Sequence, residues 1–324
     1  MLLIYLLYVI LAITVILFSI KAADYVDLID KKTNVSGAFI GGVMLAAVTS
    51  LPELFTSISG ALILNNPELV LGNILGSNIF NLATLSAIVI LFIKGFVQSQ
   101  ISKSHTKTIL FVIIINIILF IPVYFSKDFN IFNVSIVSIL ILVLYFTSLK
   151  FMATNDIDAD EEDKGECKLT LKQIFTRFIL VSIGLVIASV FITYVTDIIS
   201  VKLNLAASLS GALFLGIATS LPEVTSCVAL AKKAKFNLVV GNIIGSNIFN
   251  LFIISIIDLL YVSASLYLTN HSQTKILLLF GFIATVLIAI LLIIKNSNKK
   301  LKIVYLVLSL AIILIYIAYL ILSL

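Results

Sequence analysis

Charged side chains are scarce in this chain. Only 11% of its 324 residues are Asp, Glu, Lys or Arg, whereas 61% are hydrophobic. Soluble globular proteins have about 25% charged and about 45–50% apolar residues, which excludes a water-soluble fold. Apolar stretches of about 20 residues recur from end to end, and one such helix crosses about 30 Å of membrane hydrocarbon. The alternating ten-residue pattern of a membrane β-barrel is absent.

Cysteine and histidine are equally rare, with two of each. Cys167 falls in a hydrophilic stretch and Cys227 in an apolar one, so the pair indicates no disulfide or metal framework. We expect His105 and His271 in loops, and a histidine-based metal site is therefore disfavoured. Soft metals prefer thiolate and imidazole ligands, so they are disfavoured as well.

Ten hydrophobic segments are predicted to be transmembrane helices. Their approximate limits are 2–20, 36–65, 68–93, 108–125, 130–149, 175–199, 206–231, 236–263, 276–294 and 303–323. No positive region precedes the first, so we interpret it as a retained helix and not a secretory signal. All but three of the 21 Lys and Arg residues fall on one side of the membrane, the exceptions being Lys127, Lys202 and Lys275. The positive-inside rule makes that side cytoplasmic, which predicts a multi-pass cell-membrane protein with both termini outside. The net charge of +5 follows this topology and does not indicate nucleic-acid binding.

A hydrophilic stretch divides the chain into two halves of five segments each. We expect repeats at 1–152 and 174–324, joined by an acidic cytoplasmic linker at 153–173. Glu161 occupies the position of the EF-hand glycine, so the acidic run is interpreted as a solvated linker and not a Ca2+ sensor. Because five is odd, the second half enters the membrane with the opposite orientation. The predicted fold is an all-α polytopic membrane protein, with ten transmembrane helices as two inverted five-helix repeats.

Two polar motifs occur once in each half. Residues 49–53 read TSLPE, as do residues 219–223. Farther along, residues 72–82 read GNILGSNIFNL and residues 241–251 read GNIIGSNIFNL. The surrounding helices have diverged to generic Leu, Ile and Val, while the positions most costly to insert in a membrane stayed alike. Common ancestry alone would not spare those positions, so we attribute a function to them.

Glu53 and Glu223 lie near the middle of their spans. A carboxylate at the bilayer centre costs about 2.5–3.5 kcal/mol on insertion scales, so a cation or proton from solution is the simplest partner. Pro52 and Pro222 remove a backbone donor and break each helix, which frees carbonyl oxygens upstream. Ca2+ takes about six to eight oxygen ligands, whereas Mg2+ loses its water reluctantly. Two carboxylates would neutralise one Ca2+, and the same oxygens suit Na+.

At these motifs the sequence resembles the cation/Ca2+ exchanger superfamily, most closely its prokaryotic Na+/Ca2+ exchanger branch. The repeats of that family carry G-T-S-L-P-E followed by G-N-x-x-G-S-N-x-x-[ND], and the likeness covers essentially the whole chain. It implies an antiporter that exchanges Ca2+ for Na+ by alternating access, with spans 1 and 6 sliding across the remaining helices. The ligands it implies are Glu53 and Glu223 for Ca2+, Ser50, Ser77, Ser220 and Ser246 for Na+, Thr49, Thr219 and the carbonyls of Ala46 and Gly216 to complete the site, and Asn81 and Asn250 at its centre.

Three departures from the family pattern bear on the coupling ion. Val48 and Ala218 stand where the family has glycine before the threonine. Asn250 stands where Na+/Ca2+ exchangers often have Asp, so the site has a charge of −2 and suits one Ca2+, two or three Na+, or two protons. The H+-coupled branch has glutamate at the positions of Gly76 and Gly245, which favours Na+ coupling here.

Three other hypotheses stay open to test. An H+-coupled exchanger of Ca2+ or another divalent cation would follow a pH gradient and ignore Na+. A passive channel would conduct without a counter-ion. An intramembrane hydrolase is disfavoured, since the helices have no Ser–Lys or Ser–His pair and no central Asp pair. We therefore expect no enzymatic activity and no cofactor, with Ca2+, Na+ and lipid as partners and the monomer as the functional unit.

Overall fold

The computed structural model describes residues 2–63, 65–131, 134–153, 169–202, 218–261, 265–268, 272–297 and 301–322. The helices of the first half are α1 (Leu2–Lys32), α2 (Gly37–Phe39), η1 (Ile40–Leu45, π-helical), α3 (Ala46–Thr49), α4 (Leu51–Ile58), η2 (Ser59–Ile63, π-helical), α5 (Pro67–Leu91), α6 (Ile93–Gln98), α7 (Lys103–Phe125) and α8 (Ile136–Met152). Those of the second half are α9 (Leu171–Lys202), α11 (Leu221–Lys232), α12 (Phe236–Leu260), α13 (Ser272–Asn296) and α14 (Lys302–Leu322). A short antiparallel pair of strands, β1 (Asn130–Ile131) and β2 (Val134–Ser135), precedes α8.

Eight helices of the described chain are long and apolar enough to cross a membrane, which confirms the polytopic all-helical fold. The predicted span 130–149 corresponds to the shorter α8, because β1 and β2 occupy its beginning. The first half of the predicted span 206–231 lies outside the described residues, as does the acidic run of the linker. The count of ten therefore stays a prediction. The span 2–20 was placed too short, since α1 continues to Lys32.

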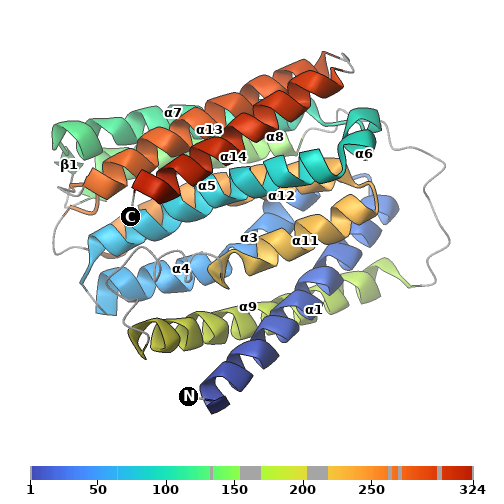
Figure 1. Ribbon diagram of the computed structural model, residues 1–324, viewed down its shortest axis with the longest axis horizontal. Coiled ribbons are helices and arrows are strands. Elements are labelled where there is room, and N and C mark those ends of the chain that lie inside the picture. Colours follow the sequence, from blue (N-terminus) through green and yellow to red (C-terminus); the bar gives the residue numbers. More distant parts are fainter. Residues whose placement is uncertain are drawn as a thin grey trace.

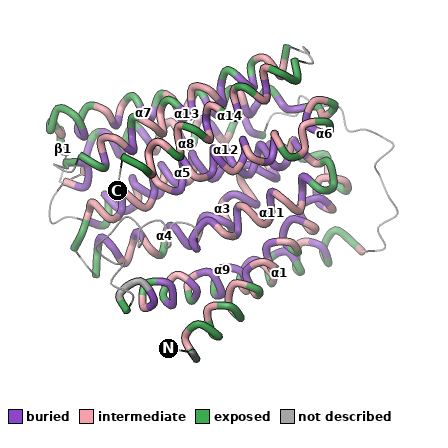
Figure 2. The backbone as a smooth tube through the Cα atoms, viewed as in Figure 1, coloured by how far each residue is buried: buried purple, intermediate pink, exposed green. Residues whose placement is uncertain are grey.

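Helices α5 and α12 form the centre of the molecule and run in opposite directions. Just before α5, Asn65 accepts a hydrogen bond of 2.8 Å from Tyr261, which follows α12. At the other ends of the two helices, the rings of Phe96 and Phe236 meet edge to face at 5.9 Å. Both helices are largely buried along their length (Figure 2). The two GNxxGSN motifs therefore face each other from antiparallel helices.

The other helices form two layers around this pair (Figure 1). On one side, α13 packs on α5 and α7, α14 packs on α5, and α8 packs on α12 and α7. On the opposite side, α1 and α9 lie side by side, with α3, α4 and α11 between them and the centre. The α1–α9 pair has a small apolar core of its own, formed by Val15, Leu185, Ala188 and Ile192. The pair also packs directly on the remaining helices, since Val26 of α1 and Phe178 of α9 belong to the main core.

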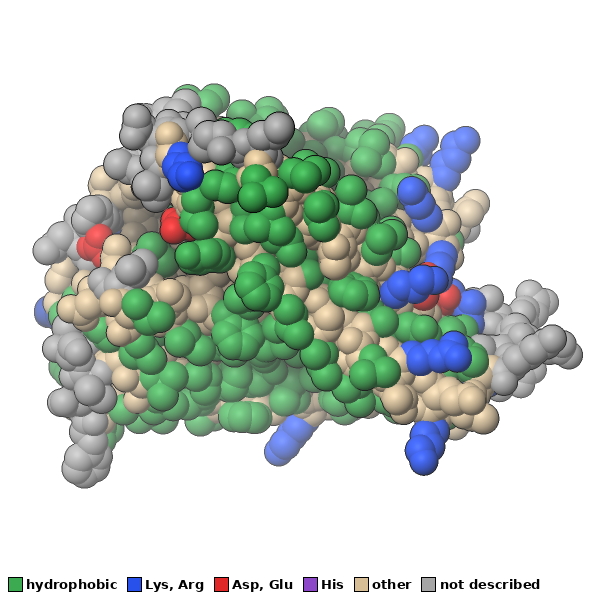
Figure 3. Space-filling view, turned by 90° about the horizontal axis from the view of Figure 1, so that it is seen from below, with side chains coloured by type: hydrophobic (Ala, Val, Ile, Leu, Met, Phe, Trp, Pro, Cys, Tyr) green, Lys and Arg blue, Asp and Glu red, His purple; other side chains and the backbone are tan. Residues whose placement is uncertain are grey.

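A hydrophobic band crosses the middle of the face that Figure 3 shows. Leu6 and Ile13 on α1, and Leu180 and Phe191 on α9, are among its exposed side chains. Most of the visible Lys and Arg side chains gather beyond the band at one end. The apolar belt and the basic end agree with the predicted gathering of Lys and Arg on one side of the membrane, and which side is cytoplasmic stays a prediction.

Candidate cation-binding site

Each TSLPE motif interrupts its helix at a serine. Ser50 separates α3 from α4 with φ −92° and ψ 4°, and Ser220 precedes α11 with φ −89° and ψ 7°. Both conformations lie in the sparsely occupied bridge region of backbone space. Pro52 and Pro222 then fall in the first turn of the following helix, where a missing N–H breaks no hydrogen bond. The glutamate after each proline therefore sits in a helical first turn, which favours negative charge.

The two carboxylates are held by serines of the opposite repeat. Glu53 and Glu223 are both fully buried. Ser50 Oγ donates to Glu223 Oε1 at 3.0 Å, and Ser220 Oγ donates to Glu53 Oε1 at 3.4 Å. Ser77 Oγ, on α5, also donates to Glu53 Oε1, at 3.3 Å. The crossed bonds place one carboxylate from each repeat within a single cluster of hydroxyl groups.

Four acceptor oxygens of this cluster have no hydrogen-bond donor in the described part of the chain. They are Glu53 Oε2, Glu223 Oε2, Asn81 Oδ1 and Asn250 Oδ1. All four residues are fully buried, and a buried acceptor without a partner costs about 1–3 kcal/mol, or more when charged. Asn81 lies one helical turn beyond Ser77, so it shares the face of α5 that meets Glu53. A bound cation would satisfy such a set of oxygens.

The remaining ligands expected from the sequence lie around Thr49. Its Oγ1 donates to the carbonyl of Ala46 at 3.3 Å and lies 3.5 Å from Ser246 Oγ. The Ala46 carbonyl also accepts the Ser50 N–H at 3.0 Å, so it keeps its helical partner. The carbonyl that loses its i+4 donor to Pro52 is that of Val48. Pro52 therefore frees the carbonyl of Val48 and leaves the carbonyl of Ala46 in its helical hydrogen bond.

Two further expected ligands belong to the second repeat. Thr219 is fully buried in the turn before α11. Gly216, whose carbonyl was expected to complete the site, lies outside the described residues. Among the described residues no group of three or more His, Cys, Asp or Glu comes together. Apart from the two carboxylates, a cation here would depend on neutral hydroxyl, amide and carbonyl oxygens.

The first asparagine of each GNxxGSN motif was not among the residues predicted for the site, although both motifs contain it. Asn73 Nδ2 donates to the backbone carbonyl of Glu53 at 3.3 Å. Asn242 Nδ2 donates to Ser226 Oγ at 3.1 Å, and Ser226 Oγ donates to the backbone carbonyl of Glu223 at 3.0 Å. Each asparagine thus ties a central helix to the helix that carries a glutamate. The presence of asparagine at this position in both repeats was the signal that could have identified these two residues.

Glycines allow η1 to approach α12 with backbone against backbone. A Cβ at Gly41 would lie 2.8 Å from the Leu238 carbonyl oxygen, and one at Gly241 would lie 3.2 Å from the Gly42 nitrogen. A Cβ at Gly245 would overlap the Gly42 carbonyl. Gly241 and Gly245 therefore permit the backbones of η1 and α12 to come into contact. At Gly72 and Gly76 of α5 no described atom lies within 4 Å of such a Cβ.

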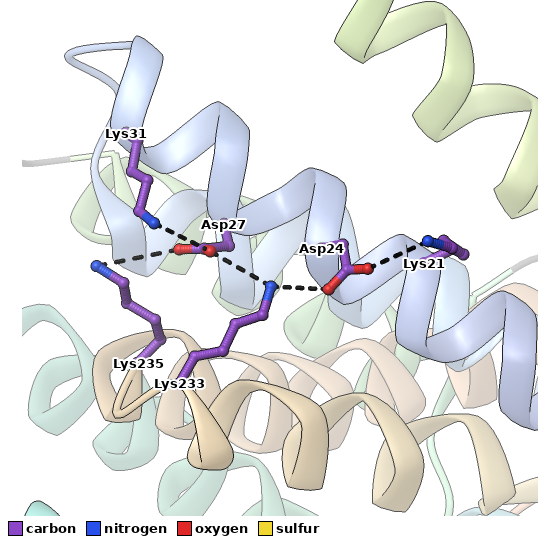
Figure 4. A network of polar contacts seen from close by, with 6 residues as sticks. All are labelled: Lys21, Asp24, Asp27, Lys31, Lys233 and Lys235. Atoms are coloured by element: carbon purple, nitrogen blue, oxygen red, sulfur yellow. Dashed lines mark hydrogen bonds and ion pairs between the residues drawn. The ribbon is translucent and has the colours of Figure 1, made fainter. Parts of the chain in front are cut away.

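An ion-pair network joins α1 to the turn between α11 and α12 (Figure 4). Asp27 is buried, and its carboxylate lies 3.3 Å from Lys31, 3.5 Å from Lys233 and 4.0 Å from Lys235. Lys233 also bonds Asp24 at 2.7 Å. From the sequence, Asp27 is predicted to lie on the surface because it alternates with lysines in an apparent loop. That prediction is wrong, because α1 continues to Lys32 and turns this side chain toward α11.

Two more polar residues are less exposed than the sequence suggested. The position of Asp258 near the outer end of its predicted span suggests a solvated side chain. Instead it is buried and accepts bonds from the Ser135 N–H at 2.9 Å and Ser138 Oγ at 2.6 Å. His105 lies in the first turn of α7 and not in a loop, and it is buried with Nε2 2.9 Å from Asn237 Oδ1. Both residues are therefore structural parts of helix contacts.

The comparisons with known proteins identify the family. A family model described as "Sodium/calcium exchanger protein" matches residues 2–154 and 174–324. The chain belongs to the sodium/calcium exchanger family. The family is one of transporters, and membership supports cation exchange across a membrane as the general activity. The match skips the linker and covers both halves that carry the motifs.

Individual relatives agree with this assignment. The chain is similar to the sodium/calcium exchanger MaX1 of Methanosarcina acetivorans, with 23% identity over 327 residues that cover 83% of this chain and 89% of the relative. It is also similar to an uncharacterized membrane protein of Methanocaldococcus jannaschii, MJ0091, with 27% identity over 66% of this chain and 68% of the relative. A solved structure of the sodium-calcium exchanger NCX_Mj matches with a TM-score of 0.75 and 22% identity, over 99% of this chain and 98% of that one, which shows a shared fold.

Proposed function

We propose that this protein is a secondary antiporter that exchanges Ca2+ for Na+ at the site between Glu53 and Glu223. The observation that carries the proposal is the pair of fully buried carboxylates, one from each repeat, with one oxygen of each left without a donor. Two uncompensated carboxylates inside a membrane protein are costly, and a cation compensates them. Family membership supports Ca2+ and Na+ as those cations.

Charge balance explains why the two ions compete for one site. One Ca2+ neutralises two carboxylates, and so do two Na+. Neutral oxygens of Ser50, Ser220 and Ser77 already lie at 3.0–3.4 Å from the carboxylates and would turn toward a bound cation. Ca2+ prefers oxygen ligands with carboxylates among them, which this set supplies. Filling by one kind of ion excludes the other, which is the requirement for exchange.

Alternating access is attributed to the α1–α9 pair. These two helices share a small apolar core beside the main one, and we propose that they move together over the other helices. Among the described residues, Val48 and Leu221 are partly buried against that core from the site side, beside the two serine breaks. We further propose that the chain has ten spans as two inverted five-helix repeats, acts as a monomer, and lies in the plasma membrane with both termini outside.

Uptake of radioactive Ca2+ into proteoliposomes tests the proposal. Vesicles loaded with Na+ or with K+ at equal pH are compared, each with wild-type protein and with Glu223→Gln. Uptake should need the outward Na+ gradient and should be lost in the variant. Uptake that follows a pH gradient and ignores Na+ would contradict Na+ coupling and favour the H+-coupled alternative. Uptake with no counter-ion dependence would contradict a carrier.

The H+-coupled alternative is favoured by one observation, the amide at Asn250. With Asn in this position the described site holds two carboxylates, and two protons would neutralise them as two Na+ do. A pH gradient imposed with K+ on both sides is therefore an arm of the same experiment. Ca2+ uptake in that arm at the rate seen with Na+ would make the proton the coupling ion.

A further inference from the structure

A second pair of asparagines crosses directly between α5 and α12. Asn78 Nδ2 donates to the backbone carbonyl of Asn247 at 3.2 Å, and Asn247 Nδ2 donates to the backbone carbonyl of Asn78 at 3.1 Å. Both side chains are buried, at 7% and 2% exposure. Each asparagine therefore donates to the backbone carbonyl of the other, and the two residues occupy the same position of the two motifs.

These bonds determine which way each amide faces. A backbone carbonyl only accepts, so the NH2 group of each crossing amide must point to it, and the amide oxygen must point away. Asn78 Oδ1 then accepts from Asn250 Nδ2 at 3.0 Å, and Asn247 Oδ1 accepts from Asn81 Nδ2 at 3.1 Å. We call these four asparagines the amide box.

The box also orients its two outer members. Because the NH2 groups of Asn81 and Asn250 are engaged, their oxygens face away from the box, and these are two of the four acceptors without a donor. An amide released from the box would be free to rotate by half a turn and present its NH2 group, which repels a cation. The orientation of each oxygen thus depends on a residue of the opposite helix.

We propose that Asn78 and Asn247 are positioning residues that hold the amide oxygens of Asn250 and Asn81 toward the transported cation. The inference rests on the proposed function, since it assumes a cation between the glutamates. It also accounts for the amide at position 250. An ionised carboxylate there has no proton to donate to Asn78 Oδ1, so Asn250 completes the fourth bond of the box and leaves two carboxylates in the described site.

Equilibrium binding of radioactive Ca2+ to the purified full chain in detergent tests the box by double-mutant cycles. Asn78→Ala is expected to weaken Ca2+ binding about 10–100-fold, the usual effect of losing an outer-shell partner of a metal ligand. In a protein that already carries Asn250→Ala it should have almost no further effect. Asn247→Ala with Asn81→Ala is the equivalent second cycle. The pairing Asn78→Ala with Ser86→Ala is the control and should be additive, because Ser86 lies about two helical turns farther along α5, outside the box.

Additive effects in both cycles would overturn the inference, because a purely structural role of Asn78 weakens binding whatever occupies position 250. Asn250→Asp gives a second test that does not remove a side chain from the helix contact. The box predicts weaker Ca2+ binding in this variant despite the added charge, and tighter binding than wild type would contradict the box. Wild-type protein that binds no Ca2+ would overturn both proposals. Binding without Na+-driven uptake would overturn only the proposed function, and the cycles would still decide on the box.

Discussion

At the scale of single residues, the site is defined by hydroxyl groups that cross between the repeats. Ser50 and Ser220 each follow a helical segment and each donate to the glutamate of the other motif. The glutamates, serines and outer asparagines were predictable because they are the polar positions that two diverged halves share. Which serine contacts which carboxylate was not, because the pairing arises only when the two broken helices meet.

Replacement of Ser50 by alanine tests the crossed bonds. A hydrogen bond to a charged group contributes about 1.5–3 kcal/mol, and 1.4 kcal/mol corresponds to a factor of ten in an equilibrium constant. Ser50→Ala should therefore raise the Na+ concentration for half-maximal exchange about tenfold or more. Ser86→Ala is the control, since Ser86 is equally buried and, within the described part of the chain, bonds only its own helix at the Leu82 carbonyl. Equal Na+ dependence in the two variants would contradict a role for Ser50 in the site.

At the scale of helices, sequence reasoning placed most spans correctly and misplaced their ends. Long apolar runs determine where a helix crosses the membrane, so α5, α7, α12, α13 and α14 were located to within a few residues. The end of α1 was missed because Asp27 and Lys31 have the charge of a loop, yet they pair four residues apart on one helix. The antiparallel contact of Asn78 with Asn247 was missed because a sequence gives no register between helices.

Gly245→Ala tests the close contact between η1 and α12. Its Cβ would overlap the Gly42 carbonyl, and such overpacking costs about 1–3 kcal/mol or more. We expect a clearly lower Tm and loss of Ca2+ uptake, because α12 carries Ser246 and Asn250. Gly281→Ala in α13 is the matched control. A Cβ there has no described atom within 4 Å, and alanine is favoured over glycine in a helix by about 0.5–1 kcal/mol. An unchanged Tm in Gly245→Ala would contradict the contact.

The network between α1 and the α11–α12 turn predicts a pH dependence of stability. Burial lowers the pKa of Lys233, but the bond to Asp24 and the charges of Asp24 and Asp27 outweigh it and raise the pKa above its ordinary 10.5. A raised folded-state pKa stabilises below the unfolded-state pKa, and this contribution is lost as the pH rises through the folded-state value.

Lys233→Gln should therefore lower the Tm in detergent at about pH 8. Its effect should shrink as the pH rises through the folded-state pKa, which lies above 10.5. The exposed Lys202, at the other end of the molecule, provides Lys202→Gln as a control with little effect across this pH range. A Tm difference of the same size across this pH range would indicate that Lys233 stabilises the fold without its ion pairs.

At the scale of the whole molecule, the orientation in the membrane follows from the distribution of Lys and Arg. In a chain whose Cys167 and Cys227 are replaced by serine, a cysteine at Lys127 should react with a membrane-impermeant maleimide in intact cells. A cysteine at Lys94 should react only after the membrane is opened, because the positive side is cytoplasmic. The reverse pattern of labelling would contradict the proposed orientation.

The central claim is that one carboxylate from each repeat holds a single Ca2+ that Na+ displaces. Equilibrium binding of radioactive Ca2+ to the purified chain, as a function of Ca2+ and Na+ concentration, tests it most directly. We predict one Ca2+ bound per chain, displacement by Na+, and loss of binding in both Glu53→Gln and Glu223→Gln, with Ser86→Ala unchanged. Wild-type affinity in either glutamine variant, or Ca2+ binding that Na+ does not displace, would contradict the shared site.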